Sequence, residues 1–270
     1  MLENYLNKVT CCDCLEGMKN LPDGCIDLVV TSPPYDNLRD YKGIKWNETI
    51  WQNIIKELFR IIKPGGVVVW VVNDAVIDGS ETGTSFKQAL YFMQTGFRLH
   101  DTMYYEKENF AKPDKTRYWQ HMEYMFVFSN GKPKTIHLIR DRKNKHKGSL
   151  RTERAVREVD GQLTPRASFT VNEYGKRSNV WRYSIGGICT NKDKFSYKHP
   201  AMFPDKLAYD HIISWSNEGG IICDPFIGSG TVAVAAIETG RQYIGMELSE
   251  EYCDIAEKRI EKAMLQRQLF

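Results

Sequence analysis

Apolar residues recur along the chain in blocks whose spacing predicts alternating strands and helices. Residues 25–30 form an apolar, β-branched run, and residues 67–72 form a second one without a polar break. Such runs are typical of parallel strands covered on both faces. Between them, residues 49–62 carry apolar side chains at helical spacing and stop at Lys63-Pro64-Gly65-Gly66. This pattern predicts a helix that ends in a turn.

The same alternation continues towards the C-terminus, with one interruption. We expect a helix over 86–95, two strands over 97–107 and 121–128 that pair at the sheet edge, a helix over 204–215, a strand from 221, a helix over 231–238, a strand over 242–247 and a closing helix over 250–265. Residues 130–196 lose this periodicity. The chain therefore predicts an α/β fold with a Rossmann-like sheet, formed by residues 1–129 and 197–270 around an inserted region, 130–196.

The first predicted strand stops abruptly at Thr31-Ser32-Pro33-Pro34-Tyr35. Each proline fixes its own φ and biases the preceding residue towards extended geometry. Open α/β sheets bind ligands beyond the carboxyl ends of their strands. A rigid loop at this place could hold a flat ligand with an amino group, which would stack on Tyr35 and donate to oxygens at Ser32 and Pro33. Taken alone, the five residues are equally compatible with a plain turn.

A glycine-rich turn follows a later strand. Residues 221–233 run from an apolar strand through Asp224-Pro225-Phe226 to Gly228-Ser229-Gly230-Thr231, and Glu247 ends the next strand. The glycines permit close approach of a ligand, and the acid is spaced to bind a ribose. Asp224 would oppose a pyrophosphate and attract a cationic sulfonium, and the turn lies too near the C-terminus for a second mononucleotide half. Both facts disfavour a nicotinamide dinucleotide. A glycine turn that binds nothing is the simpler alternative.

Together the two segments resemble the beta group of S-adenosylmethionine-dependent DNA amino-methyltransferases, which methylate N4 of cytosine or N6 of adenine. In that group the Thr-Ser-Pro-Pro-Tyr loop precedes the Asp-Pro-Phe-x-Gly-Ser-Gly-Thr segment, as it does here. The resemblance covers roughly residues 8–128 and 197–262. It implies a methyltransferase sheet in circularly rearranged order, with residues 1–129 as the catalytic half, 130–196 as the target-recognition region and 197–270 as the cofactor half.

The resemblance also assigns roles to residues. The catalytic loop would comprise Ser32, Pro33, Pro34 and Tyr35. The S-adenosylmethionine site would comprise Asp13, Thr31, His199, Pro200, Phe203, Lys206, Asp224, Pro225, Phe226, Gly228, Ser229, Gly230, Thr231 and Glu247. Within this set, Asp13 would face the adenine, Glu247 the ribose, and Lys206 the cofactor carboxylate. Asp13 could instead be a simple helix N-cap, and His199 could be a loop histidine without a ligand.

Three functional alternatives stay open beside the preferred one. Ser32 leans towards N4-cytosine, with N6-adenine methylation as the close alternative. Protein glutamine methyltransferases also use a Pro-Pro-Tyr loop, but theirs usually begins with Asn and follows the glycine segment. A degenerate fold that only binds DNA is disfavoured because both segments are intact. In the preferred mechanism the base is flipped out of the duplex, and no metal is required.

Charge is distributed unevenly. The net charge is only +3, yet residues 132–147 carry seven basic residues against one acid. A basic stretch can be a solvated face, but between the two methyltransferase-like segments it suggests phosphate contacts with double-stranded DNA. The predicted DNA-binding residues are Lys143, Lys145, Lys147, Arg151 and Arg154.

The cysteine pattern and the hydropathy indicate which metal sites and which cellular compartment the chain fits. The seven cysteines form no pair of Cys-x-x-Cys units, which disfavours a zinc site and predicts reduced thiols. The apolar content of 42% supports a packed core, and no stretch reaches transmembrane length. We expect a cytoplasmic, prokaryotic or phage-encoded enzyme. The family resemblance allows for a homodimer and a cognate restriction endonuclease, and equally for an enzyme without one.

Overall fold

The computed structural model describes residues 2–35, 46–108, 116–151, 156–164, 168–185 and 204–268. The chain divides into two compact units. The first comprises residues 1–137 and 179–270, and the second comprises residues 138–178.

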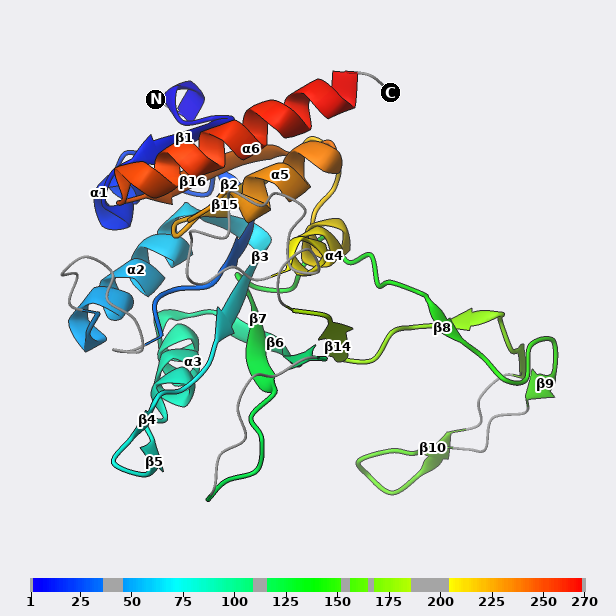
Figure 1. Ribbon diagram of the computed structural model, residues 1–270. Helices are drawn as coiled ribbons and strands as arrows, with labels where there is room; N and C mark the ends of the chain where they lie inside the picture. The colour runs from blue at the N-terminus through cyan, green and yellow to red at the C-terminus, as the bar shows by residue number, and fades with distance from the viewer. Residues whose placement is uncertain are drawn as a thin grey trace. The chain divides into compact units, whose positions relative to one another are not determined.

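An eight-stranded sheet forms the centre of the first unit (Figure 1). Its order is β1 (Lys8–Cys11), β16 (Gln242–Glu247), β15 (Ile221–Asp224), β2 (Ile26–Thr31), β3 (Ile62–Val72), β7 (Met122–Ser129), β6 (Arg98–Lys107) and β14 (Val180–Tyr183). The five strands from β1 to β3 are parallel. β7 runs antiparallel to both of its neighbours, and β14 is parallel to β6. This sheet confirms the predicted α/β fold.

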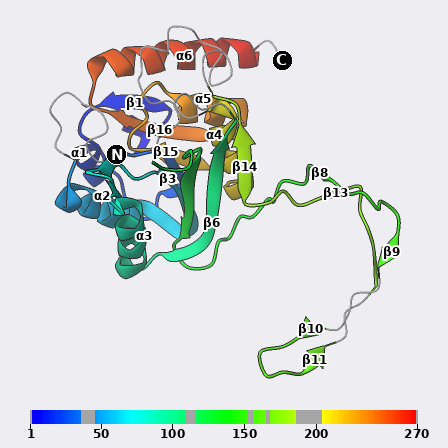
Figure 2. The ribbon, with the colours of Figure 1, turned by 60° about the horizontal axis from the view of Figure 1, so that its bottom comes forward.

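Helices cover both faces of the sheet (Figures 1 and 2). One layer contains α1 (Cys14–Lys19), α2 (Glu48–Ile61) and α3 (Thr84–Thr95), which pack side by side. The other contains α4 (Asp205–Trp215), α5 (Thr231–Glu238) and α6 (Glu250–Gln268). A short 3-10 helix, η1 (Leu2–Asn4), precedes β1. The inner parallel strands β2, β3, β15 and β16 are therefore largely buried, as apolar runs covered on both faces predict.

Sequence signals fix where these helices begin and end. Asn47 caps α2, its side chain accepting a hydrogen bond from the Ile50 N–H at 3.1 Å. α3 ends at Gly96, which adopts φ 117°, a conformation that favours glycine. On the sheet, Trp70 of β3 is fully buried, and Phe92 of α3 stacks on Phe128 of β7 with ring centroids 4.1 Å apart. These contacts join α3 to the antiparallel side of the sheet.

Two features of the sheet differ from expectation. The β6–β7 hairpin forms, but it does not lie at the edge, because β14 pairs with β6 and provides the outer strand. β14 falls within the predicted inserted region, so residues 180–183 of that region belong to the main sheet. β1 is a further strand that the apolar pattern did not reveal. It has only four residues, none of them buried.

The second unit consists of short antiparallel ladders. β8 (Arg142–Lys143) pairs with β13 (Tyr174–Gly175), β9 (Leu150–Arg151) with β12 (Phe169–Thr170), and β10 (Val156–Arg157) with β11 (Leu163–Thr164). The pairs are nested, so the segment is a two-stranded ribbon that turns between Glu158 and Gln162, where the Glu158 N–H donates to the Gln162 carbonyl at 2.8 Å. A similar small ladder, β4 (Val76–Ile77) with β5 (Ser80–Glu81), lies in the first unit.

The cysteines that the structure describes are all free thiols, in agreement with the predicted reduced state. Cys14, Cys25, Cys223 and Cys253 are buried in the core. Cys11 is exposed at the end of β1 and accepts a hydrogen bond from the Cys253 thiol at 2.7 Å.

Candidate functional site

The carboxyl ends of the parallel strands bring the predicted site residues to one edge of the sheet. In the parallel ladders, Asp224 of β15 lies opposite Gly245 of β16, and Cys11 of β1 lies opposite Glu247. Thr31, the last residue of β2, reaches Asp224 directly. Asp13 follows β1 by two residues. The strand order therefore brings residues separated by more than two hundred positions to one edge of the sheet, and open α/β sheets bind their ligands at such an edge.

The pKa of the Asp224 carboxyl at this edge is strongly raised. Its side chain is buried, and its Oδ1 accepts hydrogen bonds from the Thr31 hydroxyl at 2.6 Å and from the Phe226 N–H at 3.0 Å. Burial raises the pKa of Asp224 to about 7, the two hydrogen bonds oppose this shift, and the charge of Glu247 adds to it. A cation placed here would restore the ionised form.

The glycine-rich turn is held by backbone geometry and by Glu247. Gly228 and Gly230 adopt φ 51° and 83°, which L-residues with a Cβ rarely adopt. Glu247 Oε2 accepts the Gly228 N–H at 3.0 Å, and its Oε1 accepts the Ser249 N–H at 2.8 Å. Because each carboxylate oxygen can accept more than one hydrogen bond, Glu247 can hold the turn and still accept from ligand hydroxyls.

A buried arginine on α6, which was not among the predicted residues, supports this turn. Arg259 of α6 is 1% exposed. Its guanidinium donates to the Ser229 carbonyl at 2.9 Å and to the Thr231 hydroxyl at 3.0 Å, and it pairs with Asp205 at 2.8 Å. The helical spacing of buried α6 residues, with Ala256 and Ala263 in phase with position 259, is the signal that could have placed this charge on the inner face.

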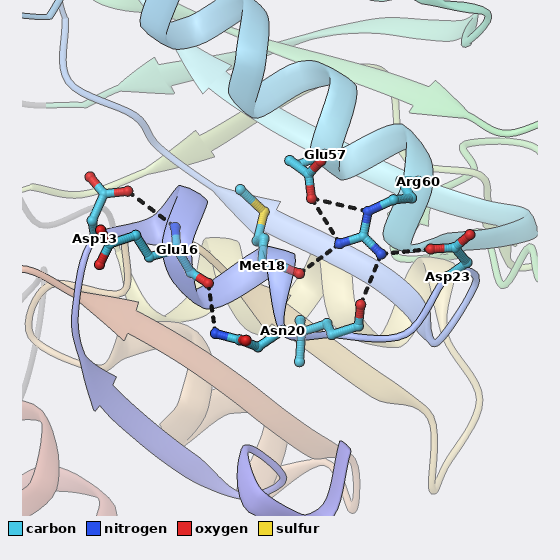
Figure 3. Close-up of polar contacts among 8 residues, drawn as sticks. Asp13, Glu16, Met18, Asn20, Asp23, Glu57 and Arg60 are labelled. Atoms are coloured by element: carbon cyan, nitrogen blue, oxygen red, sulfur yellow. Dashed lines mark hydrogen bonds and ion pairs between the residues drawn. The ribbon is translucent and has the colours of Figure 1, made fainter. Parts of the chain in front are cut away.

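Asp13 is the N-cap of α1, as one of the two sequence interpretations predicts. Its Oδ1 accepts the Leu15 N–H at 2.8 Å and the Glu16 N–H at 3.3 Å. Arg60 of α2 closes the other end of α1 by donating to the Met18 and Leu21 carbonyls at 2.7 and 2.8 Å (Figure 3). Since both ends of α1 are fixed, the carboxylate of Asp13 has a defined position beside the end of β1. A capping carboxylate keeps further acceptor lone pairs for a ligand.

Ion pairs hold Arg60 in this position. Its guanidinium contacts Glu57 of the same helix at 2.7 Å and Asp23 at 2.6 Å (Figure 3). Hydrogen bonds to these two carboxylates raise the pKa of Arg60.

The Ser32–Tyr35 loop lies beside β2 and reaches across to β7. Pro33 and Pro34 are buried, whereas Ser32 and Tyr35 are half-buried. The Ser32 hydroxyl donates to the Tyr35 hydroxyl at 3.1 Å, which in turn donates to Glu123 Oε2 at 2.9 Å. The other oxygen of Glu123 pairs with the Lys107 ammonium. Glu123 and Lys107 were not among the predicted residues, and no local sequence signal marks them.

Of the remaining predicted cofactor residues, some lie at the glycine-rich turn, one lies on α4, and others lie outside the described residues. Pro225 and Thr231 are buried in the turn, and Phe226 packs edge-on against Trp46 with ring centroids 5.7 Å apart. Lys206 pairs with Asp210 at 2.9 Å, and Asp210 also accepts from the Tyr183 hydroxyl at 2.8 Å. His199, Pro200 and Phe203 lie outside the described residues.

The predicted DNA-binding residues Lys143, Lys145, Lys147 and Arg151 are exposed on the ribbon of the second unit. Lys147 pairs with Glu173 at 2.6 Å. Arg154 lies outside the described residues. Within the described part of the chain, no group of three or more His, Cys, Asp or Glu side chains could hold a metal ion. None of the helices described there is long and apolar enough to cross a bilayer.

Comparisons with known proteins relate this chain to DNA methyltransferases. A family model described as DNA methylase, of the N6/N4 methyltransferase type, matches residues 26–258. The orphan methyltransferase M.BamHII of Bacillus amyloliquefaciens is 52% identical over 249 residues, which cover 92% of this chain and 93% of the relative. The type II methyltransferase M.HpaI of Haemophilus parainfluenzae is 26% identical over 267 residues, covering 94% and 74%.

Solved structures share the fold at lower identity. The PvuII cytosine-N4-specific DNA methyltransferase superposes with a TM-score of 0.69 at 19% identity, covering 97% of this chain and 92% of that one. A DNA modification methylase of Thermus thermophilus, complexed with S-adenosyl-L-methionine, gives a TM-score of 0.60 at 20% identity and covers 95% of each chain. The chain therefore belongs to the DNA methylase family of N4/N6 amino-methyltransferases, and it is a DNA methyltransferase.

Proposed function

We propose that this protein transfers a methyl group from S-adenosylmethionine to N4 of a flipped cytosine in double-stranded DNA. The observation that carries the proposal is that the Thr31–Asp224 pair and the Ser32–Tyr35 loop lie next to each other at one sheet edge. Thr31, which bonds the buried Asp224, is directly followed by Ser32 and the catalytic loop. A donor held at Asp224 and a base held at Ser32 would then be neighbours, so proximity would supply much of the rate enhancement.

The residues at the edge fit a cationic nucleoside. Asp224 and Glu247 contribute two carboxylates, and Arg259 lies below the turn with its guanidinium directed at Ser229 and Thr231. A pyrophosphate would need cationic or free N–H partners, and the Gly228 N–H is already bonded to Glu247. We assign the ribose hydroxyls to Glu247, the adenine to Asp13 and Phe226, and the sulfonium side to Asp224. The cofactor supplies an electrophilic methyl group.

On the substrate side, the loop would bind the base and its amino group. The Tyr35 ring would stack on the flipped base, since stacking on an aromatic side chain stabilises an extruded base. Oxygens at Ser32 and at the Pro33 carbonyl would accept the two N–H bonds of the exocyclic amine. This arrangement draws the nitrogen lone pair out of conjugation with the ring and aims it at the methyl group. Serine, a neutral acceptor, is the residue that leads us to favour cytosine over N6 of adenine.

The basic ribbon of the second unit is our candidate for target recognition. A two-stranded β-ribbon is one of the elements that the DNA major groove admits. Lys143, Lys145 and Arg151 are exposed on it, so they can reach phosphates. Replacing these three with alanine should weaken DNA binding and reduce its salt dependence by up to ~3 units of slope. Cofactor binding should be unaffected.

The relation to a restriction endonuclease stays a prediction, as does a homodimer. The relative that is 52% identical is called an orphan methyltransferase. That name favours a methyltransferase that acts without a partner endonuclease.

The test is to incubate the protein with mixed-sequence duplex DNA and S-adenosylmethionine, digest the DNA to nucleosides, and identify the methylated product by mass spectrometry. N4-methylcytosine is the expected product. N6-methyladenine would retain the family and overturn the assigned base.

Two variants test the assigned roles of the loop. Ser32→Ala and Tyr35→Ala should lose methyl transfer while binding S-adenosylmethionine as the wild type does, because we assign both side chains to the base and neither to the cofactor. Ser80→Ala removes an exposed hydroxyl on β5 and serves as the matched control. Loss of cofactor binding in the loop variants would contradict the assignment.

A further inference from the structure

A chain of hydrogen bonds leads from the proposed catalytic hydroxyl into the sheet. Ser32 donates to Tyr35 at 3.1 Å, Tyr35 donates to Glu123 at 2.9 Å, and Lys107 pairs with the far oxygen of Glu123. Glu123 lies on β7 opposite Tyr105 of β6, and its side chain is only 11% exposed. A charged group so well covered, with both oxygens occupied, is a specific arrangement and not a solvated surface acid.

The direction of these bonds follows from the chemistry of the partners. An ionised carboxylate has no proton to give, so the Tyr35 hydroxyl must be the donor to Glu123. The Tyr35 oxygen then acts as an acceptor, and the Ser32 hydroxyl donates a hydrogen bond to it. The Ser32 oxygen keeps its lone pairs for an incoming donor. Glu123 therefore sets the Ser32 hydroxyl as an acceptor, which is what an incoming amino group requires.

The reaction creates a proton that needs a destination. When the amine nitrogen bonds to the methyl carbon, the carbon–sulfur bond breaks and its electron pair stays on sulfur. The nitrogen then carries four substituents and a positive charge, so it must lose a proton to become a neutral amine. The Pro33 carbonyl can accept a hydrogen bond but cannot pass a proton onward. Ser32 can do both.

We propose that Glu123 is the proton acceptor of the methyl-transfer reaction, acting through Tyr35 and Ser32, and that Lys107 positions it. This inference rests on the proposed role of the Ser32–Tyr35 loop. As the N–H bond breaks, its electrons remain on nitrogen and its proton passes to the Ser32 oxygen. The Ser32 proton passes to the Tyr35 oxygen, and the Tyr35 proton passes to Glu123 Oε2. Both hydroxyls are restored and the carboxylate becomes neutral. The acid returns its proton to water after the product leaves.

The surroundings of Glu123 support this role. Lys107 and Tyr105 on β6 and Tyr35 on the loop are charged or titratable groups that interact with Glu123. Tyr105 is 3% exposed, and burial together with the Glu123 charge raises the pKa of Tyr105. Tyr105 therefore stays protonated and does not compete for the proton. Tyr35 is the neighbour that connects the carboxylate to the reaction.

The experiment compares four full-length proteins in single-turnover methylation of duplex DNA at saturating S-adenosylmethionine. They are the wild type, Glu123→Gln, Lys107→Met and the control Glu106→Gln. Glutamine at 123 keeps an oxygen that can accept from Tyr35, so it preserves the structural contact but is a far weaker base. Glu106 is a matched glutamate on the neighbouring strand, and it pairs with Arg182 at 2.9 Å.

Glu123→Gln should lower the single-turnover rate by about 100-fold or more, with cofactor affinity unchanged within about twofold. Lys107→Met should lower the rate by a smaller factor, and Glu106→Gln should match the wild type. The pH profile of the single-turnover rate should differ between the wild type and Glu123→Gln, because the variant lacks the proposed proton-accepting carboxylate. Saturating cofactor removes any contribution from the pH dependence of cofactor binding.

The outcomes separate the two proposals. An inactive wild type on all duplex substrates would refute the proposed function. An active wild type with an equally active Glu123→Gln variant would refute the proton-acceptor role alone. A variant that loses cofactor binding or folded structure together with activity, or that keeps the wild-type pH profile at a reduced rate, would assign Glu123 a structural role and overturn the inference.

Discussion

Cofactor binding should depend on pH through the buried carboxyl of Asp224. Burial raises the pKa of Asp224 to about 7, so near neutral pH the group changes between a neutral acid and a carboxylate. A sulfonium bound beside it would favour the carboxylate. Binding of S-adenosylmethionine should therefore release a proton from Asp224, and affinity should rise with pH.

The size of the pH effect on cofactor affinity follows from the raised pKa of Asp224. With a pKa of about 7, the ionised fraction is roughly 10% at pH 6 and roughly 90% at pH 8. If the cationic cofactor binds chiefly to the ionised form, its dissociation constant should fall about tenfold over this range. The Thr31 hydroxyl and the Phe226 N–H stabilise the carboxylate, whereas the charge of Glu247 opposes it.

Without cofactor, the contribution of Asp224 to the stability of the protein should decrease as pH rises. Because the folded pKa of Asp224 lies above its ordinary value of 3.8, the folded state binds more protons than the unfolded state between about pH 4 and pH 7. The contribution of this group is therefore most favourable at low pH and is lost as pH rises through about 7. The loss is at most about 4 kcal/mol for a shift of roughly 3 units, superimposed on the titration of other acids.

Isothermal titration calorimetry of the wild type and Asp224→Asn between pH 6 and pH 8 tests the argument. S-adenosylhomocysteine is the matched ligand, since it keeps the amino acid part and lacks the positive charge on sulfur. Its affinity should vary much less with pH. The variant should bind S-adenosylmethionine weakly at every pH. A pH-independent affinity in the wild type, or the same tenfold change in Asp224→Asn, would refute the reasoning.

Three further substitutions probe the support of the site. Arg259→Met should destabilise the protein by about 3–5 kcal/mol and weaken cofactor binding, because it removes the ion pair with Asp205 and frees the turn; thermal unfolding checks this, and exposed Lys258→Met is the control. Gly230→Ala should cost about 2 kcal/mol or more, since φ is 83° and the new Cβ would lie 3.0 Å from the Ala256 Cβ; a wild-type melting temperature would contradict it. Asp13→Ala should cost about 1 kcal/mol through loss of the cap, whereas Asp13→Asn should keep the cap and lower cofactor affinity only; equal cofactor affinity in Asp13→Asn would limit this residue to capping.

Much of the first unit could be predicted because its signals are local. The apolar run before Thr31 and the glycine turn after Asp224 each lie within a dozen residues, and strand order then brings them together. Glu123 could not be found in this way, because its partners lie far along the chain. Local helical spacing could place Arg259 on the inner face of α6, but it could not reveal the contacts with Ser229 and Thr231. The outer position of β14 was missed for the same reason. Its residues alternate between exposed and buried, and only the pairing with β6 identifies it as part of the sheet.

The position of β15 and β16 in the sheet has a consequence for synthesis. These strands come from residues 221–247, yet they lie between β1 and β2, which come from residues 8–31. While the ribosome is still making the C-terminal part, β2 has an unpaired edge and β1 has no neighbour. Unpaired strand edges promote aggregation, and contacts of such long sequence separation form slowly. The nascent chain must therefore extend past residue 247 before the proposed cofactor half of the site can form, and we expect a chain that terminates before that point to bind no cofactor.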